Sequence, residues 1–222
     1  MIGTLRYFTY SNYLAILRTV GRTKRPGRGG EAEMTGYTIA LFLHIVGALG
    51  MFVALALESV AWAGLRRSAA VQEARGWLGL LGLVRRVGPA SLGLILVAGL
   101  YMTATVVGWT AWILVALAAF VVIAALGGIS NGRSLPAIER ALQIETGPIS
   151  DVLRQRMSAP ILAASVRMRT ALALGIVFLM TTKPDVVGAL VVIVVAAALG
   201  VVASRVGTEP RLGERAARAG RP

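Results

Sequence analysis

Four ionisable side chains lie within long apolar stretches of the sequence: His44, Glu58, Arg167 and Arg169. A charge inside the hydrocarbon of a membrane costs about 2.5–3.5 kcal/mol on insertion scales unless it is paired or reached by water. Such residues are therefore the first places to look for chemistry. A carboxylate and a guanidinium can form an ion pair, relay protons or coordinate an ion, and a histidine can ligate a metal.

Glu58 is predicted to form a structural ion pair with an arginine of a later apolar stretch. His44 lies fourteen residues away, which on a helix gives nearly the same face but a separation of about 21 Å, so these two cannot touch. Arg167 and Arg169 are at a matching depth, and a two-residue step on a helix turns the side chain by about 200°. One arginine can then face Glu58 while the other reaches the headgroups. A proton-relay or ion-coordinating role for Glu58, or a Glu58 without a partner, are the alternatives.

His44 is the single histidine of the chain. We expect it to be hydrogen-bonded to a neighbouring helix, with Tyr101 or Thr103 as partner. A haem ligand is an alternative, although one histidine covers one axial position. A copper(I) site with thioether sulfurs is another, although methionines in membrane spans mostly fill the core. The methionines considered for it are Met51, Met102 and Met180. No cofactor is predicted, with haem or copper at His44 as the alternative.

The elements that position these residues are membrane-spanning helices. The chain is 56% hydrophobic and 15% charged, and its mean hydropathy is +0.74. A helix needs about 20 apolar residues to cross about 30 Å of hydrocarbon. The sequence predicts an all-α, polytopic transmembrane bundle with five spans and short interfacial helices. The spans are predicted at about 36–65, 87–107, 111–130, 161–182 and 186–204.

Two polar segments separate these spans. Ser68–Arg86 contains an apolar piece, Trp77–Val84, which is too short to cross a bilayer and is predicted to lie along the interface. Ser134–Met157 is predicted to form two short amphipathic helices, with Ser134 and Ser150 as their N-caps. Steps of small residues within the spans predict close helix packing. They are Gly47 and Gly50 with Ala54, Ala124 with Gly128, and Ala196 with Gly200.

Basic residues predict the orientation. Of the 23 Lys and Arg residues, 16 fall on the cytoplasmic side and seven outside if the amino end is outside and the carboxyl tail is in the cytoplasm. Six of the seven precede Met34. We therefore expect the native chain to start at Met34, with residues 1–33 a spurious extension; a genuine disordered or interfacial extension is the alternative. Residues 34–204 form the transmembrane domain, and residues 205–222 a basic cytoplasmic tail.

The composition narrows the classes of function. Cysteine is absent, which excludes disulfides and thiol chemistry in this chain. The net charge of +13 lies mostly between and beyond the apolar runs, so membrane topology explains it and nucleic-acid binding is not expected. No phosphate-binding loop, nucleophile elbow or dinucleotide fingerprint is present. The expected partners are the bilayer, anionic lipid headgroups at the basic loops and tail, and a second copy or another membrane protein.

Three segments resemble a bacterial, actinobacterial-type family of predicted integral membrane proteins of unknown function. They are residues 36–47 (GYTIALFLHIVG), the Gly88-Pro89 start followed by residues 99–102 (GLYM), and residues 173–185 (ALGIVFLMTTKPD). The resemblance covers about residues 34–204. Residues 43–47 (LHIVG) are also similar to the opening of copper-resistance membrane proteins, but those carry more histidines and methionines than this chain. The function expected is a non-enzymatic transport-type pathway or accessory subunit of the bacterial cytoplasmic membrane; the alternative is a redox or metal-handling protein that uses His44.

Overall fold

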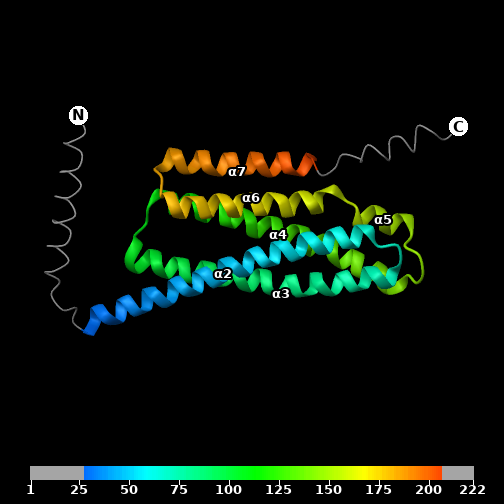
Figure 1. Ribbon diagram of the computed structural model, residues 1–222, viewed down its shortest axis with the longest axis horizontal. Helices are drawn as coiled ribbons and strands as arrows, with labels where there is room; N and C mark the ends of the chain where they lie inside the picture. Colours follow the sequence, from blue (N-terminus) through cyan, green and yellow to red (C-terminus); the bar gives the residue numbers. More distant parts are fainter. Residues whose placement is uncertain (1–27, 207–222) are drawn as a thin grey trace, which may run out of the picture.

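The computed structural model describes residues 28–206, of which 90% are helical and none is in a strand (Figure 1). Five helices are long and apolar enough to cross a membrane, which confirms the all-α transmembrane fold. The predictions for residues 1–27 and for the tail from residue 207 lie outside the described residues. The helices are α2 (Arg28–Arg67), α3 (Val71–Met102), the π-helix η1 (Thr103–Val107), α4 (Ala111–Ile144), α5 (Asp151–Met157), α6 (Pro160–Thr182) and α7 (Val186–Val206).

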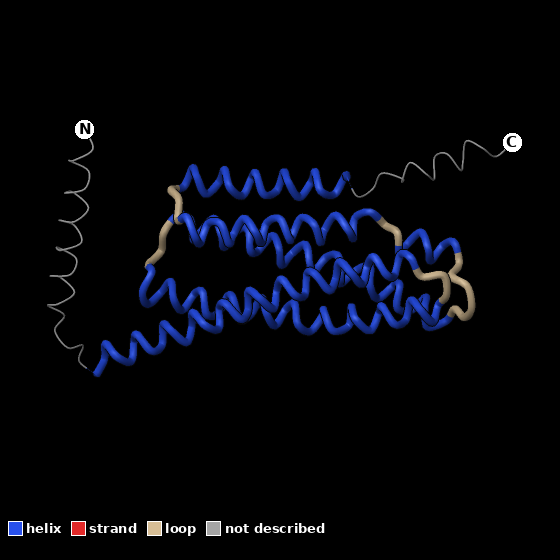
Figure 2. The backbone as a smooth tube through the Cα atoms, in the orientation of Figure 1, coloured by secondary structure: helices blue, strands red, loops and turns tan. Residues whose placement is uncertain are grey.

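Two ends of the bundle are named by the elements found there. The α5 end contains α5 and the connections 68–70 and 145–150, and the η1 end contains the connections 108–110 and 183–185. Helices α2 and α3 pack along each other, and α4, α6 and α7 form a second group (Figures 1 and 2). The two groups meet closely toward the α5 end, whereas α2 and α7 diverge toward the η1 end (Figure 1).

Helices α3 and α4 are longer than predicted, and both extend the bundle at the α5 end. α4 has 34 residues, a length of about 51 Å against about 30 Å of hydrocarbon. The expected interfacial segment Trp77–Val84 is part of α3, which starts at Val71 and continues through Pro89. The prediction that this segment lies along the interface, apart from the second span, is therefore wrong: it continues α3, and Leu81 and Val84 are buried in the bundle.

The polar segment after the third span also differs from the prediction. α4 runs through Pro136 to Ile144, so Ser134 is not an N-cap and one of the two predicted short helices belongs to α4. The second short helix is present as α5. Its N-cap is Ser150, whose hydroxyl accepts a hydrogen bond from the Leu153 amide at 3.3 Å, as predicted.

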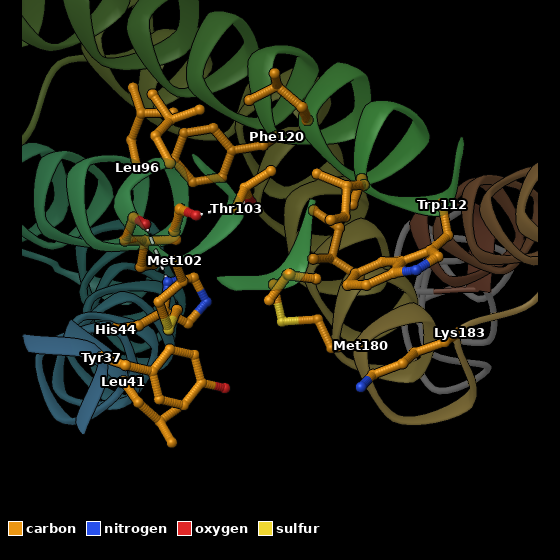
Figure 3. Close-up of a pocket in the computed structure, with 18 residues that line it drawn as sticks. Tyr37, Leu41, His44, Leu96, Met102, Thr103, Trp112, Phe120, Met180 and Lys183 are labelled. Atoms are coloured by element: carbon orange, nitrogen blue, oxygen red, sulfur yellow. Dashed lines mark hydrogen bonds between the residues drawn. The ribbon is translucent and has the colours of Figure 1, made fainter. Parts of the chain in front are cut away.

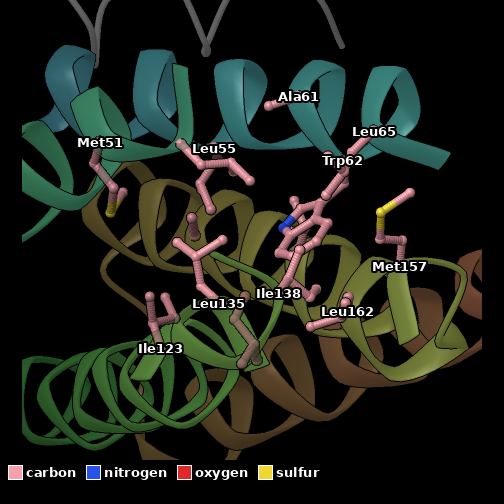
Figure 4. Packing of buried hydrophobic residues seen from close by; sticks show 14 of the residues in the cluster. Met51, Leu55, Ala61, Trp62, Leu65, Ile123, Leu135, Ile138, Met157 and Leu162 are labelled. Carbon is pink, nitrogen blue, oxygen red and sulfur yellow. The ribbon is translucent and has the colours of Figure 1, made fainter. Parts of the chain in front are cut away.

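At the α5 end, the buried hydrophobic core is built around two side chains of α2 (Figure 4), and the same cluster continues along α6 and α7 as far as Leu179 and Ala189. Trp62 and Leu65 of α2 lie against residues of α4, α5 and the start of α6, and each is at most 2% exposed. The partners with the lowest exposure are Leu135, Ile138, Leu142, Leu153, Met157 and Leu162. Two backbone hydrogen bonds join the connections: Val71 donates to the Gly147 carbonyl at 3.0 Å and Ile149 to the Ala69 carbonyl at 3.3 Å.

Small residues allow α2 to approach α3, and α6 to approach α7. A Cβ atom placed on Gly47 would lie 2.9 Å from Cγ1 of Ile95, and one placed on Gly200 would lie 2.9 Å from the Met168 sulfur. These two predicted steps are therefore real packing sites. The predicted Ala124–Gly128 step is wrong: Gly128 has no neighbour within 4 Å of an added Cβ, and its side of α4 is exposed.

Candidate functional site

Glu58 and Arg169 form the ion pair predicted from the sequence. Nη2 of Arg169 donates to Oε1 of Glu58 at 2.6 Å, and the two side chains are 7% and 2% exposed, respectively. Nε of Arg169 also donates to the Ser165 carbonyl at 3.3 Å. Gly127 of α4 makes room for the guanidinium, because an added Cβ there would lie 3.2 Å from Nη1 of Arg169. The pair thus joins α2 to α6 beside a glycine of α4.

Arg167 points away from Glu58, as the rotation of two helical residues requires. Its Nη1 atom donates to the carbonyls of Ala203 and Ser204, each at 3.3 Å. Those carbonyls belong to the last turn of α7, where cations are favoured by the helix dipole. Of the two candidate arginines, the structure therefore brings one to Glu58 and places the other on the far side of α6.

A cavity of about 440 Å³ lies next to the ion pair, between α2, α3 and α4. Glu58, Arg169 and Arg85 all line it, together with four glycines on α3 and α4: Gly88, Gly127, Gly128 and Gly132. We call it the inner cavity. Its size and its charged groups fit ordered water beside the pair, which lowers the cost of keeping both charges away from bulk solvent.

The sequence predicted a hydrogen bond from His44 to a neighbouring helix, with Tyr101 or Thr103 as partner. The neighbouring helix is confirmed, but the partner is a backbone carbonyl of α3. The Nδ1 atom of His44 lies 3.0 Å from the Ile95 oxygen. Because a carbonyl oxygen accepts, Nδ1 is the donor in this contact, and Nε2 takes no part in it. The ring packs on Gly99, where an added Cβ would lie 3.2 Å from Cε1.

Tyr101 and Thr103 have other partners. The hydroxyl of Tyr101 lies over Gly36 at 2.5 Å from the position of an added Cβ, and the side chain is 43% exposed. Thr103 donates to the Gly99 carbonyl at 2.8 Å. Tyr101 is therefore not part of a site with His44, because its ring packs along α2 on the outside of the α2–α3 pair.

A second cavity, of about 310 Å³, separates the two helix groups at the η1 end. We call it the outer cavity. Figure 3 shows Tyr37 and His44 on the α2 side, with Met180 and Lys183 facing them from the α6 side. Trp112 and other apolar side chains form much of the rest of its wall. An apolar chamber with a few polar groups turned inward is typical of a small-molecule site.

Sequence reasoning found His44 but not the residues that surround it. Lys183 ends α6: it is the single described non-glycine residue with positive φ, at 46°, and its amide donates to the Leu179 carbonyl at 2.9 Å. Its place across the outer cavity from α2 depends on how far the helix groups diverge, which no sequence pattern records. Tyr37 and Trp112 had no distinguishing signal beyond their aromatic character.

The methionines proposed as copper ligands are divided between the two cavities. Met102 and Met180 line the outer cavity with His44, whereas Met51 lines the inner one. Among residues 28–206 no group of three or more His, Cys, Asp or Glu side chains is close enough to hold a metal ion.

Comparison of the chain with protein-family models, with curated proteins and with solved structures found no significant match.

Proposed function

We propose that this chain is a non-enzymatic, transport-type membrane protein that takes a small amphipathic molecule into the outer cavity. The observation that carries the proposal is the divergence of α2–α3 from α4–α6 around that cavity, with His44 on one wall and Lys183 on the other. Apolar walls favour a hydrocarbon or aromatic body. A cation at the mouth favours an anionic group on the same molecule, such as a carboxylate.

The position of the two cavities supports a pathway rather than an isolated pocket. On α3 the outer cavity extends from Ile95 to Val107 through η1, and the inner cavity from Val84 to Leu92. On α4 the same order holds, with Phe120 in the outer cavity and Ile123 in the inner one. The cavities thus follow one another along α3 and α4, and the core of the α5 end closes the far side.

We further propose that the protein lies in the bacterial cytoplasmic membrane with the η1 end outside and the α5 end in the cytoplasm. The arginines in the last turns of α2 and α5 support this orientation, whereas the η1 end carries Lys183. Lys and Arg in short loops are enriched on the cytoplasmic side. Reporter fusions at residues 109 and 148 test it: an outside-active reporter is expected to work only at 109.

The binding proposal is tested with a brominated stearate, whose bromine atoms quench tryptophan fluorescence on contact. In the detergent-solubilised full chain we expect saturable quenching that depends on Trp112, and about a fivefold to tenfold weaker affinity in Lys183→Gln, a difference typical of one charge-assisted contact. The methyl ester of the same acid is expected to bind the native protein and Lys183→Gln alike.

Trp109 provides the matched control, because it is 60% exposed and does not line the cavity. Trp112→Phe should remove the saturable quenching, and Trp109→Phe should retain it. Quenching that is unchanged in Trp112→Phe, or that rises without saturation in all variants, would contradict the proposal.

A redox or metal-handling role at His44 is the second candidate. One observation favours it: Nδ1 of His44 is held by a backbone carbonyl, which is the usual arrangement of a histidine that ligates a metal through Nε2. Met102 and Met180 line the same cavity and suit copper(I). An absorption spectrum and metal analysis of the native protein decide the matter: a Soret band or one copper per chain would replace the first proposal by this one.

A further inference from the structure

A long groove lies on the lipid-facing side of the bundle, between α6 and α7, and is separate from both cavities. Its volume is about 740 Å³, and its walls include Leu174 and Phe178 of α6 and Val195 and Leu199 of α7. All four of these side chains are more than half exposed, from 51% to 62%. We call this surface the α6–α7 groove.

The dimensions of the groove match one leaflet of a bilayer. Along α6 it extends from Arg167 to Phe178, eleven residues or about 17 Å of helix. Half of the hydrocarbon thickness is about 15 Å. The groove is therefore as long as one acyl chain of a phospholipid, with Arg167 at the level of the headgroup.

Basic side chains gather at the α5 end of the groove. Ser59 of α2 lines it beside Arg167, and Arg66 is seven residues further along the same face of α2. Arg66 is close enough to both Arg167 and Arg67 to be repelled by their charges. Neither of the two ion pairs in residues 28–206 involves any of these three arginines.

The guanidinium groups keep donors for a ligand. The described hydrogen bonds of Arg167 both use Nη1, and that of Arg66 uses Nε, which donates to the Trp62 carbonyl at 3.3 Å. A guanidinium has five N–H groups, so each arginine retains a pair that fits a phosphate oxygen. An anion at this point would also relieve the repulsion between Arg66 and Arg167.

We propose that the α6–α7 groove is a binding site for one anionic membrane phospholipid, with an acyl chain along Leu174 and Leu199 and its phosphate between Arg66 and Arg167. The apolar length and the cluster of cations without carboxylate partners together determine the chemistry of the occupant. A neutral lipid would fill the groove but would leave the charges of Arg66 and Arg167 without a counter-charge.

Native mass spectrometry of the detergent-purified full chain tests this, with dioleoyl phosphatidylglycerol and dioleoyl phosphatidylcholine as probes. We expect one phosphatidylglycerol to be retained in preference to phosphatidylcholine. The double variant Arg66→Gln with Arg167→Gln should weaken phosphatidylglycerol binding about 30-fold, from about a fivefold effect for each arginine near a headgroup. The matched control is Arg154→Gln with Arg156→Gln, which removes the same charge from exposed positions of α5.

A second pair of variants tests the acyl chain without changing any charge. Leu199→Trp fills the groove from the lipid side and should displace the phospholipid, whereas Val194→Trp, at a residue 65% exposed on α7 and outside the groove, should not. Equal retention of the two lipids, or an equal loss in the α5 control, would overturn the proposal. Lipid-free dimers that Leu199→Trp dissociates would also overturn it and assign the groove to a second copy of the chain.

Discussion

The two ends of the bundle are built in different ways. At the α5 end, Trp62, Leu135 and Leu142 are almost completely buried, and hydrogen bonds tie the connections together. At the η1 end, the connections 108–110 and 183–185 are three residues long, the helix groups diverge, and the space between them is a cavity. One end resembles the interior of a water-soluble helical protein, and the other resembles a binding chamber.

The difference follows from the surroundings that each end is expected to have. Helices that extend beyond the hydrocarbon are in water, where burying apolar surface is strongly favourable, and they collapse into a core. Helices within lipid gain little from that effect and rely on close contacts and polar pairs. A cavity between lipid-exposed helices therefore costs less than one in the core. The Glu58–Arg169 pair lies where the two regions join.

The largest effect is expected in the α5-end core. Trp62→Ala should lower the free energy of unfolding by about 3–5 kcal/mol, because it removes a large side chain that is 2% exposed. Thermal unfolding in detergent, followed by circular dichroism, measures this loss. Trp109→Ala, at the η1 end, is the control and should change stability by less than about 0.5 kcal/mol. Equal losses in both variants would mean that the two ends are not built differently.

The next largest effect is expected at the Glu58–Arg169 ion pair, where the two regions join. Glu58→Gln keeps the shape of the side chain but leaves Arg169 without a counter-charge, which should cost about 3 kcal/mol. The double variant Glu58→Arg with Arg169→Glu should recover part of the folded yield lost in either single variant, and the same exchange with Arg167 should not. Size-exclusion chromatography of the membrane-extracted protein gives the readout. Recovery with Arg167 instead would show that the wrong arginine had been paired.

Some of these structural features could be predicted from the sequence and others could not. The Glu58 pair was predictable because a buried carboxylate needs a cation at its own depth, and only Arg167 and Arg169 were available. The helical extension from Val71 to Arg86 was not, because eight apolar residues between arginines fit an interfacial segment as well as a packed one. The partner of His44 was also hidden, since a backbone carbonyl leaves no signature in residue type. Hydropathy was sufficient for the five spans because each apolar run approaches the thickness of a bilayer.

Smaller effects on stability, opposite in sign, are expected from alanine substitutions at two glycines. A Cβ on Gly64 would overlap the ring of Trp77, so Gly64→Ala should cost about 1–3 kcal/mol of stability. Gly93 has no neighbour within 4 Å of an added Cβ, so Gly93→Ala should raise stability by up to about 1 kcal/mol through helix propensity. Melting temperatures of the two variants, measured side by side, test whether Gly64 lies in the α2–α3 contact and Gly93 lies outside it.

The smallest effect on stability is expected at the outer cavity. His44→Leu removes one hydrogen bond to the Ile95 carbonyl and should cost about 0.5–1.5 kcal/mol. Its main consequence should be on binding of the brominated stearate, measured in the same preparation. A melting temperature that falls as far as in Trp62→Ala would show that His44 is a structural residue of the fold rather than part of a chamber.

The difference between the two ends means that the bundle is held together at the α5 end and can open at the η1 end. At the α5 end the core holds α2, α3 and α4 together, whereas at the η1 end one three-residue connection joins η1 to α4, another joins α6 to α7, and the outer cavity lies between α2–α3 and α4–α6. Lateral pressure from lipids at the η1 end therefore acts on the helices far from the core that holds them together. We expect the volume of the outer cavity to depend on the lateral packing of the surrounding leaflet. The bilayer itself would then determine how far apart the two helix groups lie at the η1 end.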